Sequence, residues 1–123
     1  MKEKEAEGSV CQHFQRAAEV LGRRWNPQVV RVLLGGPHRF GEIREAIPGI
    51  SDHLLSERLK QLEAEGILRR TVTDGRPVRI EYGLTDAGSD LRRAIDALGG
   101  WAERWSRVGE GAQSRSTAGG RSR

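Results

Sequence analysis

The chain has 123 residues, a hydrophobic share of 36% and a formal net charge of +4 at neutral pH. This length predicts one domain, and the low apolar content predicts that a second subunit completes some apolar faces. Val32 to Leu34 is the longest strictly apolar run, which excludes a membrane span, and no apolar leader follows the charged residues 2–8. A single cysteine, Cys11, excludes an intramolecular disulfide, so we expect a protein of the reducing cytoplasm.

The first part of the chain predicts two helices. Apolar residues recur at helical spacing from Phe14 to Leu21. Asn26 and Pro27 are typical of a second helix start, because asparagine caps free N–H groups and proline has no N–H to leave unpaired. That helix ends at the Gly-Gly-Pro sequence of residues 35–37. We expect Trp25 and the apolar residues that follow it to be core.

A short helix and a leucine-rich helix follow. Apolar residues at 40, 43 and 47 mark the short helix, and a Pro-Gly pair at 48–49 closes it. Ser51 is placed to cap the next helix, 52–65, because its hydroxyl can accept a hydrogen bond from a free N–H. Helix, tight turn, helix is the order of a helix-turn-helix unit.

Residues 52–65 divide into an apolar and a polar side. At about 100° per residue the leucines cluster on one side, namely Leu55, Leu59 and Leu62. The opposite stripe has side chains suited to base edges and phosphates: His53, Ser56, Glu57 and Lys60. Arg58 lies beside the buried side, where it can reach a phosphate or pair with Glu42 or Glu45. An ordinary solvated helix would show a similar polar face.

Two extended segments around Asp74-Gly75 predict a β-hairpin, and Pro77 indicates a loop longer than two residues. The second segment alternates apolar residues with polar ones or glycine from residue 78 to 84, the period of a half-buried strand. The hairpin is net basic, which makes Arg76 and Arg79 candidates for phosphate or minor-groove contact. Arg39, before the short helix, is a further candidate for DNA backbone contact. The alternative is a soluble hairpin that carries arginines without a DNA role.

One final helix is predicted, capped by Thr85 or Asp86 and bent at Gly99-Gly100. Its apolar residues are spaced 4, 3, 4 and 3 apart, a short heptad-like seam. We expect a homodimer seam mainly in 10–22 and 86–106, with intramolecular packing as the alternative. The interface candidates are Phe14, Ala18, Leu21, Leu91, Ile95, Leu98, Trp101, Ala102 and Trp105. The predicted domain is 10–107, between a flexible tail (1–9) and a disordered tail (108–123).

Several motifs, in this order, resemble the HxlR-type bacterial transcriptional regulators: Cys11, Trp25, residues 33–40, residues 47–51, Arg58-Leu59 and residues 81–88. The resemblance extends from about Cys11 to Trp105. It implies an α+β winged helix-turn-helix homodimer whose terminal helices form the dimer interface. The implied partner is double-stranded operator DNA, pseudo-palindromic as a two-fold dimer requires, with 52–65 as the recognition helix.

The resemblance also bears on sensing and activity. Some members of this group use the matching cysteine as a thiol sensor, so Cys11 is a candidate sensor of oxidants or electrophiles, and a quiet thiol is the alternative. The three histidines are scattered, and no catalytic, cofactor or metal-binding motif is present, so no enzyme, cofactor or metal is expected. Two other functions stay open: a protein-interaction module, and a sensor that binds a small-molecule effector near Trp25, Trp101 and Trp105.

Overall fold

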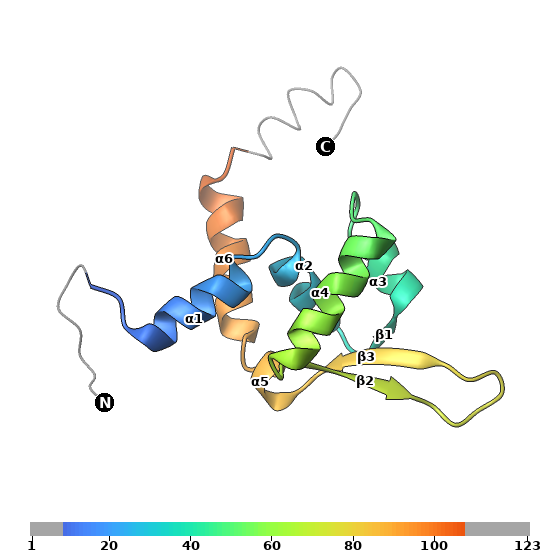
Figure 1. Cartoon of the computed structure of the whole chain (residues 1–123). Coiled ribbons are helices and arrows are strands. Elements are labelled where there is room, and N and C mark those ends of the chain that lie inside the picture. The colour runs from blue at the N-terminus through green and yellow to red at the C-terminus, as the bar shows by residue number, and fades with distance from the viewer. Residues whose placement is uncertain (1–8, 108–123) are drawn as a thin grey trace, which may run out of the picture. The chain divides into compact units, whose positions relative to one another are not determined.

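The computed structural model describes residues 9–107 and has the predicted α+β architecture (Figure 1). It forms two compact units, divided after Arg92. The predicted tails lie outside the described residues, except for Ser9. The elements, in chain order, are α1 (Gln12–Leu21), α2 (Asn26–Leu33), β1 (His38–Arg39), α3 (Phe40–Ala46), α4 (Asp52–Ala64), β2 (Leu68–Val72), β3 (Ile80–Leu84), α5 (Asp86–Ser89) and α6 (Arg92–Trp105).

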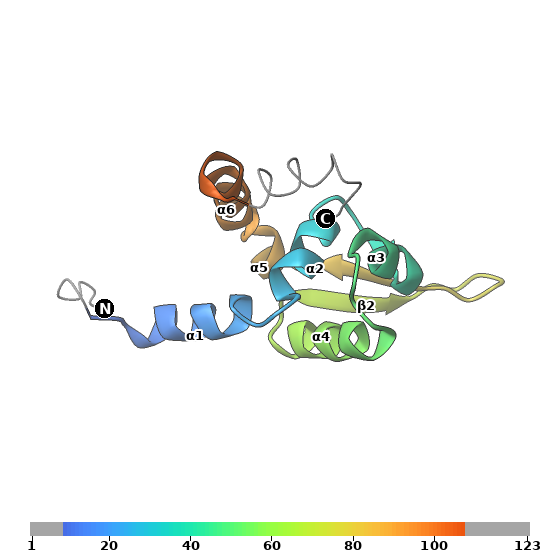
Figure 2. The same cartoon turned by 90° about the horizontal axis from the view of Figure 1, so that it is seen from above.

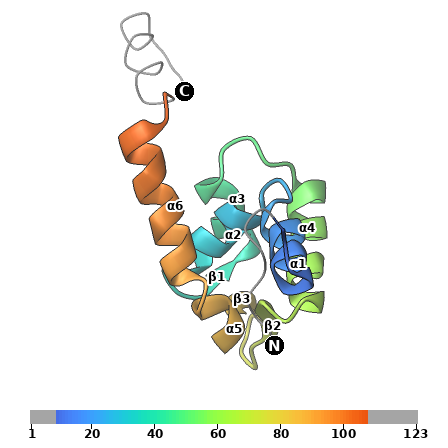
Figure 3. The same cartoon turned by 90° about the vertical axis from the view of Figure 1, so that its left-hand side faces the viewer.

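The sheet of the first unit has three antiparallel strands in the order β1-β3-β2. Helices α2, α3 and α4 lie over one of its faces (Figures 1 and 3). The β2–β3 hairpin is the predicted one, and it extends past the helices as a wing (Figure 2). Strand β1 was not predicted, because two residues are too short to show a period. Its pairing makes β3 the central strand.

The predicted alternation of buried and exposed residues is wrong in β3. Ile80 is exposed and residues 81–84 are all half-buried, so neither face of the strand is fully covered. Val78, predicted to lie in this strand, precedes it and is 64% exposed. The apolar pattern therefore runs beyond the strand into the loop.

The core of the first unit joins α2, α3, α4 and the sheet. Its side chains, all 2% exposed or less, include Val29, Val30, Leu33, Ile43, Leu55, Leu59, Leu62 and Leu68. All three leucines predicted to face inward from α4 are among them. Their burial removes apolar surface from water and fixes the rotation of α4 about its axis.

The junction between α1 and α2 differs from the prediction. Trp25, not Asn26, occupies the N-cap position of α2, in the left-handed region with φ of 80°. Asn26 is 2% exposed, and its Nδ2 donates to the Val20 carbonyl at 2.7 Å. The asparagine therefore ties the start of α2 to the end of α1. Trp25, expected in the core, is half-buried.

The single predicted C-terminal helix is two helices. Thr85 Oγ1 accepts from the Gly88 N–H at 3.2 Å, as predicted for a cap, and donates to the Gly66 carbonyl at 2.6 Å. The short α5 that it caps is thereby tied to the end of α4, and the chain turns before α6 begins. Gly99 and Gly100 both lie within α6. Each glycine costs a helix about 1 kcal/mol relative to alanine, and α6 continues through both positions despite this cost.

Gly88 is the glycine at which a side chain should cost most stability. An added Cβ would lie 2.2 Å from the Ile67 carbonyl oxygen and 2.9 Å from Leu84 Cδ2. We expect Gly88→Ala to lower the free energy of unfolding by about 1–3 kcal/mol, because backbone must move. Urea denaturation measures this change.

Gly100→Ala is the matched control. A Cβ at Gly100 meets nothing within 4 Å, and the residue is inside α6. This substitution should raise the free energy of unfolding by about 0.5–1 kcal/mol, because alanine loses less backbone entropy in a helix. Equal effects of the two substitutions would contradict the close approach of Gly88 to Ile67.

Candidate nucleic-acid interface

The polar stripe of α4 is exposed opposite the buried leucines. His53, Glu57 and Lys60 are exposed, and Ser56 is half-buried. Ser51 caps the helix as predicted, since its Oγ accepts from the Leu54 N–H at 3.1 Å. The stripe therefore combines hydrogen-bonding side chains of different lengths on a helix that the core holds from behind.

An arginine partly neutralises the acidic first turn of α4. Arg44 Nη1 lies 3.1 Å from Asp52 Oδ1 and 3.4 Å from Oδ2. Asp52 would otherwise repel a phosphate near the helix N-terminus, which carries a partial positive charge. Because the pair is exposed, it contributes little stability, and its effect is on the local charge.

Arg39 caps α3 and shares its charge with Glu42. The Arg39 backbone N–H donates to Glu42 Oε1 at 2.9 Å, and its Nη2 lies 3.6 Å from Oε2. The backbone hydrogen bond is the largest cause that lowers the pKa of Glu42, and the charges of Arg39 and His38 lower it further. A DNA phosphate at Arg39 would therefore compete with an ionised carboxylate.

Arg58 has a partner that the sequence did not indicate. Its Nε donates to the Arg24 carbonyl at 2.9 Å, whereas the prediction offered Glu42 or Glu45. The Arg24 guanidinium lies over the Trp25 ring, 4.6 Å from its centroid. Arg58 thus fastens the α1–α2 junction to the flank of α4, and its predicted DNA contact stays untested.

A second link joins α1 to α4. Arg16 forms an ion pair with Glu65, the C-cap of α4, and lies 3.4 Å from Glu19 Oε1. Arg16 and Glu65 are 49 residues apart in the chain, so no local sequence pattern could have revealed this pair. With the Arg58 contact, α1 and its following loop are connected to the predicted recognition helix at two points.

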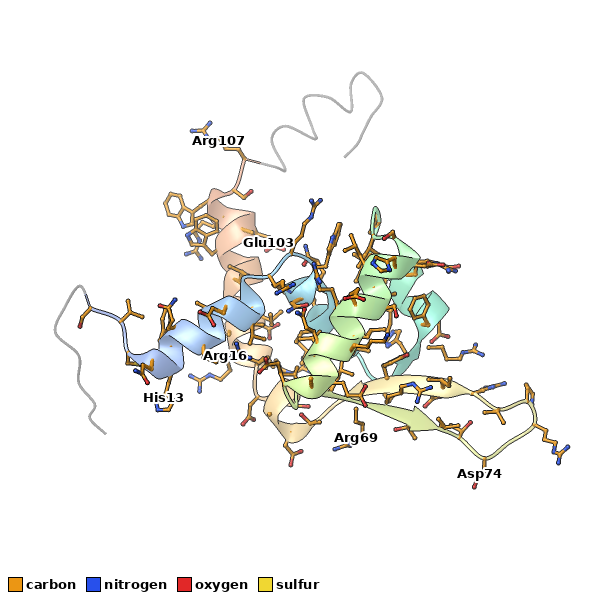
Figure 4. All side chains as sticks on the ribbon, in the orientation of Figure 1. His13, Arg16, Arg69, Asp74, Glu103 and Arg107 are labelled. Carbon is orange, nitrogen blue, oxygen red and sulfur yellow. The ribbon has the colours of Figure 1, made fainter. Side chains whose placement is uncertain are left out.

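The wing presents several cations to solvent. Its loop is closed at the base, since the Thr73 N–H donates to the Arg79 carbonyl at 2.8 Å and the Arg79 N–H donates to Thr73 Oγ1 at 3.2 Å. Asp74 lies at the outer end of the hairpin and Arg69 nearer its base (Figure 4). Arg76 and Arg79 are exposed, and within residues 9–107 neither forms an ion pair. Their charges are therefore available to an anionic partner.

Cys11 is the N-cap residue of α1. Its Sγ accepts from the Phe14 N–H at 3.3 Å, and the residue is half-buried. The sequence predicted that Cys11 precedes a helix. The structure also shows that its sulfur accepts a hydrogen bond from the first turn of that helix. The first N–H groups of a helix have no partner within the helix, so the Cys11 sulfur satisfies one of them.

The predicted dimer seam contains exposed aromatic and aliphatic side chains. Phe14 on α1 is 64% exposed, and on α6 Leu98, Trp101 and Trp105 are 56%, 60% and 65% exposed. Ala18 and Ala102 are exposed, whereas Leu21 and Leu91 are half-buried. Ile95 is only 4% exposed in the single chain, so it offers little surface to a partner.

Other kinds of site are not found in the described part of the chain. Within residues 9–107, no group of three or more histidine, cysteine or acidic side chains could hold a metal ion. None of the helices described there has the length and apolar content needed to cross a membrane.

Comparison with known proteins identifies the family. Residues 20–110 match the model of the HxlR-like helix-turn-helix family. The chain belongs to this family. It is 43% identical over 99 residues to YvaP, an uncharacterized HTH-type transcriptional regulator of Bacillus subtilis, with 80% of this chain and 92% of YvaP covered. It is 39% identical over 102 residues to the HTH-type transcriptional regulator YodB of the same organism, with 83% and 91% covered.

Solved structures agree with this assignment. Reduced YodB from B. subtilis superposes with a TM-score of 0.72 at 40% identity, covering 79% of this chain and 95% of that one. The redox regulator HypR in its reduced form gives a TM-score of 0.73 at 30% identity, covering 81% and 99%. The protein is therefore a winged helix-turn-helix, DNA-binding transcriptional regulator of the HxlR type, as the sequence motifs predicted. The relatives named above are HTH-type transcriptional regulators.

Proposed function

We propose that the protein acts as a cytoplasmic homodimer on a pseudo-palindromic operator in double-stranded DNA, with one α4 in each half-site. The observation that carries this proposal is the exposed polar stripe of α4, opposite the buried leucines. A two-fold dimer would place its two recognition helices about one helical turn apart on the DNA. The wing would then rest on the flanking backbone or minor groove.

Each side chain of the stripe has a role that its chemistry supports. His53 and Ser56 can donate to or accept from base edges, and Glu57 can accept from a cytosine amino group. Lys60 can bind a guanine edge or a phosphate. Ser51, Arg39 and Arg58 are proposed to contact the DNA backbone, although each already has a partner within the protein.

Selection of bound duplexes from a random pool tests this function. We expect a two-fold symmetric consensus for the wild-type protein. His53→Ala and Ser56→Ala should change the preferred bases more than the overall affinity, because base contacts specify sequence. Arg76→Glu and Arg79→Glu should each weaken all duplexes by roughly tenfold and lower the slope of log affinity against log salt by about 1, because one phosphate contact is lost.

Arg31→Glu is the matched control for charge. It reverses an exposed arginine of α2, outside both the proposed DNA contacts and the proposed dimer seam, and should leave affinity nearly unchanged. Equal weakening by Arg31→Glu and Arg76→Glu would show a general charge effect and refute the wing contact. A protein that selects no duplex would instead fit a protein-interaction module.

Dimerisation through the terminal helices is supported by the exposed apolar side chains of α1 and α6. We propose a domain of residues 10–107 with its seam in 10–22 and 86–106. Trp105→Asp should convert the dimer to monomer in sedimentation at micromolar concentration, because a charge would be buried without a partner. Val78→Asp is the control, because Val78 is 64% exposed and Trp105 is 65% exposed. The Val78→Asp protein should stay dimeric. A wild-type protein that is monomeric under these conditions would contradict the proposal.

A second function, sensing of oxidants or electrophiles at Cys11, is favoured by its N-cap hydrogen bond. YodB has been solved reduced, treated with diamide and bound to quinone, and HypR reduced and oxidised. We propose that the Cys11 thiolate can add to a quinone ring carbon. The new S–C bond would place the electron pair on one ring oxygen, which takes a proton from water. The proton on the attacked ring carbon would then pass through water to the second oxygen, and the product would be a hydroquinone thioether.

Mass spectrometry and DNA-binding assays test the sensor role together. After quinone treatment, we expect one adduct per wild-type chain and at least a tenfold loss of operator affinity, on the order of the usual allosteric coupling. Cys11→Ser should form no adduct and keep its affinity. Loss of affinity in the treated Cys11→Ser protein would refute the role of Cys11.

A further inference from the structure

One face of the wing is apolar and exposed to solvent. Val72, Ile80 and Val78 are 52%, 37% and 64% exposed, and we call them the apolar wing face. Val72 and Ile80 are direct partners across the two strands, so their side chains lie on the same face. Val72 and Val78 also line one shallow hollow in the wing, together with Pro77 and Arg76.

The strand register shows which face of the sheet this is. Leu68, four residues before Val72, is 2% exposed and pairs with Leu84. Side chains four residues apart in a strand lie on the same face. The apolar wing face is thus the outward continuation of the face covered by the helices, including α4, which packs against β2 (Figures 1 and 2).

The fold does not require apolar residues at these positions. Strands favour β-branched side chains, but threonine satisfies that preference on a solvated face. The polar face of the same hairpin illustrates this, since Thr71 pairs there with Glu81. Isolated exposed valines need no explanation, whereas a contiguous apolar patch with a charged rim marks an interaction surface.

Cations border this patch at both ends. Arg70 lies on the same face as Val72, two residues nearer the body of the domain. Arg76 lines the hollow at the outer end, where Asp74 is the one acidic residue of the lining. An apolar strip between two arginines complements the DNA minor groove, which has sugar C–H walls and phosphates along both edges. Proteins that bind the minor groove commonly insert apolar side chains beside their arginines.

We propose that the apolar wing face enters the minor groove beside each half-site and favours flanks that lack the guanine amino group. This inference rests on the proposed function, since it assumes that α4 occupies the adjacent major groove. Guanine projects its N2 amino group into the minor groove, where A·T pairs have none. Val72 and Val78 would pack where that group would otherwise project, and would thereby contribute to operator choice at positions that α4 does not reach.

Inosine substitution provides a direct test. An I·C pair differs from G·C only by the missing N2 amino group in the minor groove. Duplexes would carry the selected half-sites with either G·C or I·C pairs at each flanking position. We expect the wild-type dimer to bind the best I·C flank about fivefold more tightly than its G·C counterpart, the lower end of the usual effect of one base pair.

The variant Val72→Thr/Val78→Ser should bind both flanks equally and retain the wild-type half-site preference, which shows that it is folded. Thr71→Ser changes an exposed residue on the opposite face of the same hairpin and should keep the flank preference. A wild-type protein without a flank preference, or a double variant that retains it, would overturn the inference. Loss of the dimer as the main change in the double variant would also overturn the inference. The apolar wing face would then contact a second copy of the chain and not DNA.

These outcomes separate the inference from the function on which it rests. If the flank effect is absent while half-site selectivity depends on His53, only the role of the apolar wing face is refuted. If the wild-type protein selects no half-site at all, the proposed function fails and the inference fails with it.

Discussion

Burial of the α4 leucines is the interaction on which the rest of this structure depends. Leu55, Leu59 and Leu62 are each 2% exposed or less, and they set the rotation of the helix on the core. Removing one large aliphatic side chain from such a site costs about 2–5 kcal/mol, a large share of a small domain's stability. Because these three positions point inward, the stripe that contains His53 and Lys60 must point outward. Core packing and the proposed DNA recognition therefore use opposite sides of one helix.

The flank of α4 between these two sides connects it to the N-terminal helix. Arg58 binds the Arg24 carbonyl, and Glu65 at the helix end pairs with Arg16. The candidate sensor Cys11 caps the same α1 at its other end. A change in the position or order of α1 would therefore act on the recognition helix through two polar contacts. Exposed ion pairs contribute little to stability, so such contacts can be rearranged at low cost.

The wing combines two kinds of surface. Its exposed arginines are proposed to provide a sequence-independent attraction to phosphates, which falls steeply with salt. Its valines and isoleucine are proposed to provide a surface that responds to the guanine amino group in the minor groove. Strand alternation keeps the two chemistries apart, since Val72 and Ile80 share one face and Thr71 and Glu81 the other.

The sequence by itself determined the elements that local rules control. Leucine periodicity, the Ser51 cap and the Pro-Gly turn predicted α4 and its inward face, and the Asp74-Gly75 turn signal predicted the hairpin. Tertiary structure alone decided the features that depend on distant partners. Strand β1 exists because His38 and Arg39 pair with β3, and Arg58 turns to Arg24, 34 residues away. The C-terminal helix divides where α5 is tied to the end of α4. Hydrophobic periodicity and helix capping depend on residues a few positions apart. Strand pairing, the Arg58 contact and the division of the C-terminal helix depend on which surfaces the folded chain brings together.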